Sequence, residues 1–316
     1  MKILLSFIFT FSLLHASDYK NTNGKAIDKS LSELLEWRLS KDKPILSKIE
    51  ISNSWQEIIN NKNTNFAIWI GHSTFLINLN GVYILTDPIF SDRASPLKNI
   101  GPKRLIEPAI NINEVPKVDI VTISHNHYDH LDIKSLKIIA NKFPQAKFLV
   151  PVGDKKLLEK NNIDNIFEFQ WWDTMSINDI DITFTPVQHW SARGIFDRNK
   201  SLWGGWYFND HGLKLFHAGD SGYTKDFVDI KNNLGAPDLA FIPIGAYDPE
   251  WFMSESHMNP EEAVKVSLDL NAKQSIGMHW GTFTLTSEDT IDPFNRVNSL
   301  KNHNLKTIKP GEYLIF

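Results

Sequence analysis

The sequence has 316 residues, of which 42% are hydrophobic and 22% are charged, and this length suits one large domain or two small ones. Such a composition excludes a disordered, collagen-like or coiled-coil chain. The formal net charge of -4 gives no basic field that would attract nucleic acid. The absence of cysteine excludes disulfides, thiolate-bound zinc, iron–sulfur clusters and a cysteine nucleophile, which leaves 11 histidines as nitrogen ligands for a metal.

The start of the chain is typical of a secretory signal peptide. Lys2 is followed by an apolar run over residues 3–14 and then by His15-Ala16-Ser17, which ends in small residues. The run is shorter than the ~20 apolar residues that cross a bilayer. We therefore predict a signal peptide over residues 1–17 and export to the periplasm or out of the cell, with an uncleaved N-terminal membrane anchor as the alternative.

Residues 18–60 are polar and rich in Asn, Lys and Ser. One amphipathic stretch within them contains Leu31, Leu34, Leu35 and Trp37. This pattern predicts an N-terminal extension that packs against the main domain. No repeat or proline-rich linker interrupts the sequence after it, so residues 61–316 are predicted to form one catalytic domain.

The first strand-like runs of that domain are Phe66–Leu79 and Val82–Leu85. Asn80-Gly81 joins them and suits a type I′ hairpin turn. Further strands are predicted at Val118–Ile123, Ile180–Phe184, Leu213–Phe216, Leu239–Ile242 and Ser275–Met278. Several of these runs alternate with a period of two, as half-buried strands do.

Helical patterns lie between these strands. Ile133–Phe143 follows Asp132, which suits an N-cap, and Asn259-Pro260 opens another helix with a capping Asn and a Pro at the first helical position. Strands and helices alternate along the whole domain. The sequence therefore predicts an α/β or α+β fold with two sheets.

Histidine and aspartate residues follow four predicted strands at the point where each strand ends. The run Val118–Ser124 leads into a cluster that spans residues 125–130, and the other three runs lead into His189, Asp220 and His279. Because ligand sites gather at the carboxyl ends of strands, we expect these side chains to lie close together.

The cluster at residues 125–130 reads His-x-His-x-Asp-His and indicates a metal site. A single histidine is usually a structural or surface residue, but packing alone does not explain this cluster, and its burial without a cation would be costly. The first ligand group is predicted to be His125, His127 and His189, the second ligand group Asp129, His130 and His279, with Asp220 shared by both. Nitrogen and oxygen ligands suit Zn, Mn or Fe. A site of two cations with a shared carboxylate is typical of hydrolases.

Residues 125–132 resemble the His-x-His-x-Asp-His-Leu-Asp signature of the metallo-β-lactamase superfamily. Longer segments resemble the N-acylphosphatidylethanolamine-hydrolysing phospholipase D family, and they are Trp69–Thr74, Thr86–Pro96, Gly101–Arg104, Gln188–Trp190, Ala218–Tyr223, Ile242–Tyr247, His257–Val264 and Met278–Phe283. The resemblance covers about residue 61 to the C-terminus. It implies an αββα sandwich of two mixed sheets flanked by helices, two Zn²⁺ ions per chain and phosphodiester hydrolysis of a lipid. The segment before residue 61 has no counterpart in it, so compartment and membrane contact are not carried over.

The family substrate implies that a metal-bridging hydroxide releases N-acylethanolamine and phosphatidic acid. The catalytic residues are predicted to be Asp129, Asp220 and His257, where His257 contacts the phosphate or protonates the leaving oxygen unless it is only part of a polar loop. Asp87 and Asp132 are predicted to orient ligand imidazoles, although helix capping suits Asp132 equally well.

The predicted substrate contacts are aromatic. Tyr128 lies within the ligand cluster, and Trp190 and Trp280 each follow a proposed ligand directly, which favours walls of a substrate pocket. Lys103 and Arg104 suit lipid phosphates or a solvated surface. The expected partner is a phospholipid or another phosphodiester, with peripheral membrane contact and no nucleic acid.

The remaining histidines receive no part in the chemistry. His15, His211 and His303 are taken as ordinary polar residues, and His217 as a core residue or a support for the ligands. Alternative functions are hydrolysis of a lactone, a β-lactam or an RNA phosphodiester, and a metal-stabilised binding module without catalysis. The acidic balance argues against RNA, and the complete ligand set argues against the binding module.

Overall fold

The computed structural model describes residues 19–40 and 43–316. The predicted signal peptide over residues 1–17 lies outside the described residues and stays a prediction. Within the described ranges, the helices are too short or too polar to cross a membrane.

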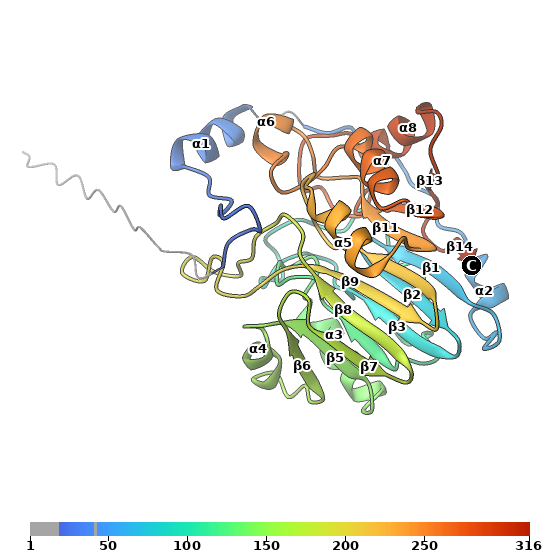
Figure 1. Cartoon of the computed structure of the whole chain (residues 1–316). Helices are drawn as coiled ribbons and strands as arrows, with labels where there is room; N and C mark the ends of the chain where they lie inside the picture. The colour runs from blue at the N-terminus through green and yellow to red at the C-terminus, as the bar shows by residue number, and fades with distance from the viewer. Residues whose placement is uncertain (1–18, 41–42) are drawn as a thin grey trace, which may run out of the picture.

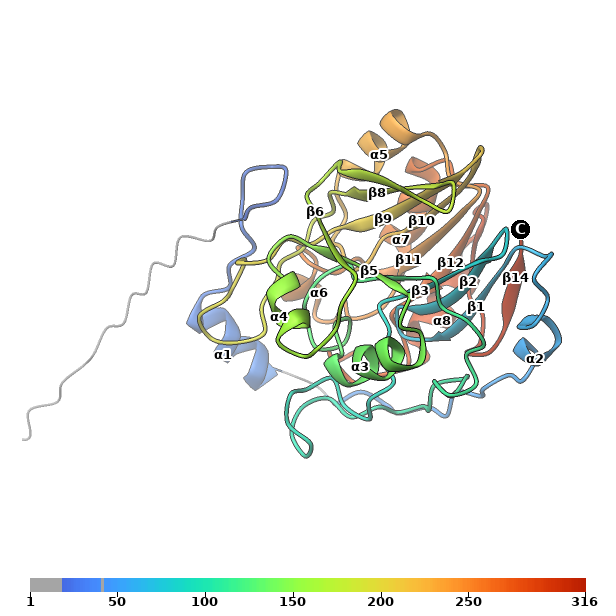
Figure 2. The same ribbon diagram turned by 90° about the horizontal axis from the view of Figure 1, so that it is seen from below.

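Two seven-stranded sheets face each other at the centre of the molecule (Figures 1 and 2). The first sheet has the order β14 (Tyr313–Ile315), β1 (Phe66–Gly71), β2 (Thr74–Leu79), β3 (Val82–Thr86), β4 (Ile120–Thr122), β5 (Lys147–Pro151) and β6 (Ile166–Phe169). The second has the order β13 (Leu305–Lys306), β12 (Gln274–Met278), β11 (Leu239–Pro243), β10 (Leu213–His217), β9 (Gly205–Asp210), β8 (Ile180–Thr185) and β7 (Thr174–Ile177). Each sheet combines antiparallel and parallel pairs, so both are mixed.

The helices lie outside the two sheets (Figure 1). They are α1 (Leu31–Ser40), α2 (Trp55–Ile58), α3 (Ile133–Lys142), α4 (Lys155–Glu159), α5 (Asp226–Leu234), α6 (Glu250–Met253), α7 (Pro260–Asp269) and α8 (Asp292–Ser299). The two predicted caps are confirmed, because the Asp132 side chain accepts from the Lys134 N–H and Asn259 forms a reciprocal capping box with Glu262. The predicted αββα sandwich of two mixed sheets flanked by helices is confirmed.

The period-two pattern of β1 divides its side chains between two hydrophobic layers. Ala67 and Trp69 point into the layer between the sheets, where Phe75 of the first sheet meets Phe241 of the second with ring centroids 4.4 Å apart. Phe66 and the other alternate residues pack with α3 on the outer side. Burial on both faces explains why these strands are apolar almost throughout.

The sequence predicted a single strand-like run over Phe66–Leu79. The structure does not have one strand there. The run forms β1 and β2, which pair antiparallel around a tight turn at His72-Ser73. The next turn agrees with its prediction, because Asn80 and Gly81 have φ values of 48° and 85°, the left-handed region that a type I′ turn requires.

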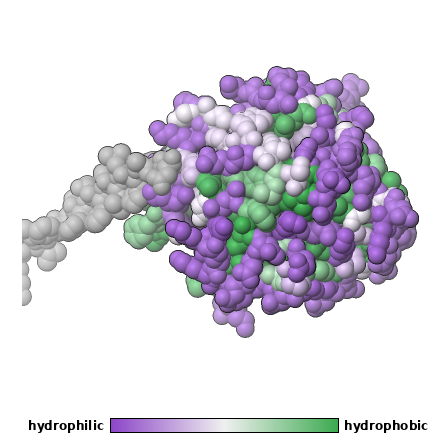
Figure 3. All heavy atoms as spheres, turned by 60° about the horizontal axis from the view of Figure 1, so that its bottom comes forward, coloured by the Kyte–Doolittle hydropathy of each residue, from purple (hydrophilic) through white to green (hydrophobic). Residues whose placement is uncertain are grey.

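The segment before residue 61 contacts the sandwich at several points. Ile27, Ile49, Trp55 and Ile58 are buried, and α2 contributes to the core beneath the first sheet. The domain boundary at residue 61 stays a prediction. On the face shown in Figure 3, hydrophilic side chains surround a central group of hydrophobic ones.

Candidate metal centre

The predicted ligands come from loops that follow strands of both sheets and meet at one edge of the sandwich. His125, His127, Asp129 and His130 follow β4 in the first sheet, and His189, Asp220 and His279 follow β8, β10 and β12 in the second. A main-chain bond from the His279 N–H to the His72 carbonyl, 3.1 Å long, joins the two sheets at this edge. The structure therefore brings all the predicted ligands together.

Asp220 lies at the centre of the cluster. Its Oδ2 is 3.1 Å from Nε2 of both His130 and His279, and 3.9 Å from Nε2 of both His125 and His189. One carboxylate oxygen thus reaches residues of both predicted ligand groups. This position is the one that a bridging ligand occupies between two cations.

Each ligand group is compact. In the first, Nδ1 of His127 lies 2.8 Å from Nε2 of His125 and 3.3 Å from Nε2 of His189. In the second, Oδ2 of Asp129 lies 3.4 Å from Nε2 of His279 and 3.6 Å from Nε2 of His130. Within each group the donor atoms lie within 4.8 Å of one another, close enough to share one cation.

The donor set fits a pair of cations. Within the described part of the chain, Nε2 of His130, Nε2 of His279 and Oδ1 of Asp220 are buried and make no hydrogen bond. Buried polar atoms are almost always satisfied, so atoms of this kind that converge on one point need a partner of another type. Sulfur-free imidazole and carboxylate donors suit a divalent transition metal.

The electrostatics favour ligand protonation states in the first ligand group and at Asp220. Burial lowers the pKa of His125 and His189 well below the ordinary value and that of His127 to about 4, so these imidazoles are neutral and offer a lone pair. Burial alone would raise the pKa of Asp220, but the neighbouring His130 and His279 outweigh it and hold that pKa well below its usual range. The carboxylate is therefore ionised and able to bind cations.

Other hydrogen bonds fix the ligand rings by their second nitrogen. The ring N–H at Nδ1 of His130 donates to Oδ2 of Asp87 over 2.7 Å, and Asp87 also accepts from the backbone N–H and hydroxyl of Ser124. Nδ1 of His189 donates to the Ser256 carbonyl over 2.9 Å. Each bond leaves Nε2 aimed into the cluster. The position of Asp87 agrees with its predicted orienting role.

Asp132 was predicted either to orient a ligand imidazole or to cap a helix, and only the helix cap is present. It caps α3 through the Lys134 N–H, and its Oδ2 accepts from the Ser135 hydroxyl at 2.5 Å and from the Ser91 N–H at 3.2 Å. These donors occupy the carboxylate, and the structure gives it no bond to a ligand imidazole among the described residues. The prediction of an imidazole contact was wrong, because the start of α3 turns this side chain toward its own first turn.

His72 belongs to the cluster, although its sequence context gave it no role. Its Nε2 lies 3.0 Å from Oδ2 of Asp129, and its ring centroid lies 4.0 Å from that of His279. It sits in the β1–β2 turn with a left-handed φ of 54°. The signal for it was the Gly-His break inside the apolar run Phe66–Leu79, which marks a strand end like those before the other ligands.

A cavity of about 410 Å³ opens onto the cluster. His127, Asp129, Asp220 and His257 form its floor, and most of its remaining wall is apolar. Tyr128 and Trp190 line it, as predicted for substrate contacts; Arg193 covers the Tyr128 ring and Arg198 covers the Trp190 ring, each at 4.0 Å. A phosphate at the floor would leave its apolar substituents against these walls.

Trp280 does not line this cavity. It is buried in the core, with its ring centroid 5.2 Å from that of Trp69 and 5.6 Å from that of Phe294. The prediction that it forms a wall of the substrate pocket was wrong, because the chain turns after His279 and directs the next side chain between the sheets and α8 instead.

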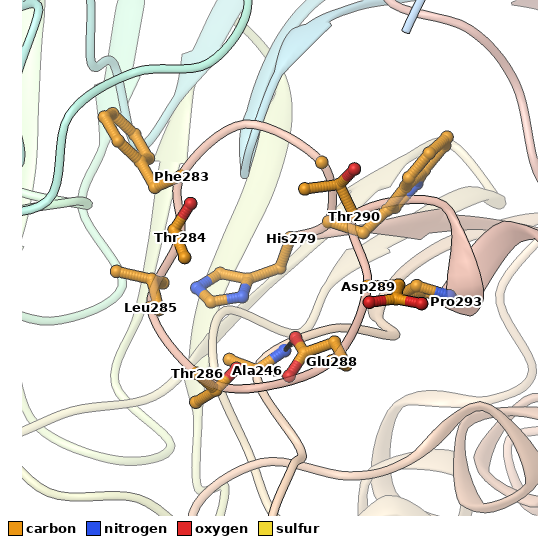
Figure 4. Close-up of a pocket in the computed structure, with 12 residues that line it drawn as sticks. Ala246, His279, Phe283, Thr284, Leu285, Thr286, Glu288, Asp289, Thr290 and Pro293 are labelled. Atoms are coloured by element: carbon orange, nitrogen blue, oxygen red, sulfur yellow. Dashed lines mark hydrogen bonds between the residues drawn. The ribbon is translucent and has the colours of Figure 1, made fainter. Parts of the chain in front are cut away.

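A second cavity, of only about 20 Å³, borders the other side of His279. Figure 4 shows the loop after β12 curving around this ring, with Thr286 and Glu288 close to Ala246 below it. The Glu288 carboxylate accepts from the Ala246 N–H at 2.6 Å and from the Thr286 hydroxyl, which closes the loop. The space suits about one water molecule.

His257 lies beside the cluster rather than in either predicted group. Its Nδ1 is 3.8 Å from Oδ2 of Asp220, and its side chain borders the large cavity. Burial lowers its pKa to about 4, so the ring is neutral near pH ~7. A neutral imidazole suits a hydrogen bond to a phosphoryl oxygen better than protonation of a leaving group.

Neither Lys103 nor Arg104 lines the large cavity. The buried Arg104 guanidinium donates to the carbonyls of Ile89 and Ser91, so its predicted roles at lipid phosphates or on a solvated surface were wrong. Lys103 is exposed, which agrees with a solvated surface. His217 is a buried core residue whose Nε2 donates to the Ser73 carbonyl.

Comparison with known proteins gives the class of this protein. Residues 83–280 match the family described as "Beta-lactamase superfamily domain". A solved metallo hydrolase from Ignicoccus hospitalis, Igni18, has the same fold, with a TM-score of 0.61 and 24% identity over 80% of this chain and 98% of that one. The chain thus belongs to the metallo-β-lactamase superfamily.

Two relatives define the family more closely. The mitochondrial N-acyl-phosphatidylethanolamine-hydrolyzing phospholipase D of Saccharomyces cerevisiae is 41% identical over 81% of this chain and 56% of its own length, so this chain spans about half of it. The N-acyl-phosphatidylethanolamine-hydrolyzing phospholipase D 1 of Caenorhabditis elegans is 36% identical over 89% of this chain and 85% of its own length. The chain belongs to the N-acyl-phosphatidylethanolamine-hydrolyzing phospholipase D family.

Proposed function

We propose that this protein is a phosphodiesterase of phospholipase D type that hydrolyses N-acyl-phosphatidylethanolamine-like lipids to phosphatidic acid and N-acylethanolamine. One observation carries the proposal: the mainly apolar cavity of about 410 Å³ has the ligand cluster as its floor. In a phosphodiester with aliphatic substituents, the phosphate suits the ligand cluster and the aliphatic substituents suit the apolar walls. The names of the two relatives support the same substrate class.

The metal proposed for the site is zinc, with two ions per chain and manganese or iron as the alternatives. When bound, a pair of divalent cations supplies an acidified water and polarises a phosphoryl oxygen. The chain contributes neutral imidazoles in the first ligand group and ionised carboxylates at Asp129 and Asp220. Asp87 holds the His130 ring in one orientation, so that the donors do not have to rearrange during the reaction.

Hydrolysis adds water across a P–O bond, and the ethanolamine oxygen leaves with a proton. The neutral His257 ring, 3.8 Å from Asp220, is placed to donate a hydrogen bond to a phosphoryl oxygen above the cluster. Tyr128 and Trp190 form walls on which the substituents rest, and their rings are fixed by Arg193 and Arg198. These residues orient the substrate and exclude water from its apolar part.

We propose a lipid surface as the source of the substrate. Leu31 and Leu35 of α1 are exposed, as are Ile195 and Phe196 in the loop between the two arginines that cover the cavity aromatics. Exposed apolar side chains of this kind suit shallow insertion into a membrane interface. Export of the chain stays a prediction.

A substrate panel tests the function. Purified protein loaded with zinc is assayed on N-acyl-phosphatidylethanolamine, a chromogenic phosphodiester, a homoserine lactone and a cephalosporin, and the lipid products are identified by mass spectrometry. We expect phosphatidic acid and N-acylethanolamine, with Asp220→Asn as the inactive control. Turnover of the lactone or cephalosporin without cleavage of either phosphodiester would overturn the proposal.

A further inference from the structure

We infer that residues 19–40, named here the N-terminal strap, form one wall of the substrate cavity and select substrates by the length of their aliphatic chain. The inference rests on the proposed function for the chemistry at the floor of the cavity. It adds a specificity element from a part of the chain that contributes no metal ligand. Two groups of contacts, named here the first and second anchors, hold the strap in place. Both lie in the part of the strap that precedes α1.

The first anchor holds the strap at a metal ligand. Oδ1 of Asn21, which is almost fully buried, accepts the backbone N–H of His189 and the indole N–H of Trp203, both over 3.0 Å. The Tyr19 N–H donates to the Asn199 carbonyl, and the Thr22 hydroxyl donates to Asp226. The strap therefore starts from a fixed point beside the first ligand group.

The second anchor holds the strap against the cavity, which Ile27 and Lys29 line. Nζ of Lys29 lies 2.6 Å from the Glu255 carboxylate, and the Arg198 guanidinium donates to the Ile27 carbonyl over 2.5 Å. Arg198 also covers the Trp190 ring, so one side chain joins the strap to a cavity wall. These contacts direct α1 toward α6, beside which it lies in Figure 1.

Side chains of the strap complete the cavity. Ile27, Lys29, Leu34 and Trp37 line it together with Phe252 and Met253 of α6. The Trp37 indole stacks on the Phe252 ring, with centroids 5.1 Å apart and planes 5° from parallel. Because the same cavity extends from Asp220 to Trp37, an aliphatic chain on a phosphate at the floor reaches Trp37 only if it is long enough.

Binding of two alkylphosphonates tests the inference. Octylphosphonate and dodecylphosphonate resist phosphodiester hydrolysis and are used below their micelle concentrations, on the full zinc-loaded protein, by calorimetry. We expect Trp37→Ala to reduce the preference for the longer chain by roughly tenfold, because the added methylenes lose their apolar contact. Leu39→Ala is the matched control, since Leu39 lies on the same helix but is 87% exposed and does not line the cavity.

A conservative variant separates specificity from loss of structure. Trp37→Phe retains a ring against Phe252 and is expected to keep most of the preference, while the thermal midpoint of each variant reports its folding. Equal preferences in Trp37→Ala, Leu39→Ala and the parent would overturn the inference. If the preference moves with Trp37 but no phosphodiester is cleaved, the strap is a wall and the proposed function is wrong. If phosphodiesters are cleaved but the preference for the longer chain does not change in Trp37→Ala, the proposed function stands and the inference about the strap is wrong.

Discussion

Nε2 of His72 lies 3.0 Å from Oδ2 of Asp129, and the ring is almost fully buried. Burial lowers the pKa of His72 to about 3, so the ring is neutral and its N–H donates to the carboxylate. His72 comes from the turn between β1 and β2, whereas Asp129 follows β4. The bond therefore fixes the orientation of a predicted ligand from a separate element of the same sheet.

Replacement of His72 is expected to weaken the second ligand group. His72→Phe keeps a ring in the site but loses the donor to Asp129, and we expect metal affinity and activity to fall by about 10–100-fold. Metal content after dialysis, together with phosphodiesterase rate, measures the effect. His72→Gln retains an N–H donor and should lose less; equal losses in both variants would contradict an orienting hydrogen bond.

Asp220→Asn is expected to remove activity while leaving the fold in place. The amide is close in size to the carboxylate but carries no charge to share between two cations, so hydrolysis should drop by at least about a hundredfold. Metal analysis should show less than the full complement. Circular dichroism and thermal melting check that the sandwich persists, and a fully active Asp220→Asn protein would rule out a bridging role.

Asp87 and Asp132 are expected to differ although both lie near the cluster. Asp87→Ala removes the acceptor of the His130 ring N–H and should reduce activity by about 10–100-fold. Asp132→Ala removes the cap of α3 and should cost about 0.5–2 kcal/mol of unfolding free energy with little change in rate. Urea titration and steady-state rates measure the two effects, and an equal loss of rate in both variants would contradict the separate roles.

Removal of metal is expected to inactivate and destabilise the protein. The cluster would then bury several imidazoles and two carboxylates without cations, which disfavours the folded state. Treatment with a chelator should lower the thermal midpoint, and addition of zinc should restore it in a concentration-dependent manner. Readdition of manganese and iron in parallel identifies the metal that restores the rate. An unchanged midpoint in protein shown to be metal-free would argue against the predicted site.

Asp154 predicts a specific pH dependence of stability. It is almost fully buried and accepts from the Asn126 amide over 3.0 Å, and burial raises its pKa from 3.8 to about 7. The folded state thus binds the proton more tightly than the unfolded state, so stability falls as the pH rises from about 4 to about 7. Asp154→Asn stays neutral and should lack this decrease, which amounts to a few kcal/mol at most. Urea titrations at pH ~5 and pH ~8 measure it; parallel decreases in both proteins would contradict it.

Much of the fold and ligand set could be predicted because short-range signals were strong. Asn80-Gly81 and Asn259-Pro260 have backbone requirements that few other residues meet, and the structure has the turn and the cap there. The His and Asp residues at strand ends were predicted to converge, and the topology brings them to one edge. Asp132 shows the limit, because a carboxylate before a helix suits both a cap and a ligand contact.

What the sequence did not predict depends on long-range contacts. The run Phe66–Leu79 is apolar through its turn, so periodicity did not separate β1 from β2, and the role of His72 was missed with that turn. The inward direction of Trp280 is set by Trp69 and Phe294 from distant segments. The contacts of Asn21 with His189 and Trp203 join residues with no local pattern in common.

Gly219 precedes Asp220 with a φ of +63°, and a Cβ atom there would lie 2.6 Å from Cβ of Ser124, the residue before His125. The main chain at Gly219 therefore lies directly against the Ser124 side chain, and this close approach requires a residue without a Cβ atom. A replacement in the walls of the large cavity can thus change which molecule fits without moving the backbone that carries Asp220.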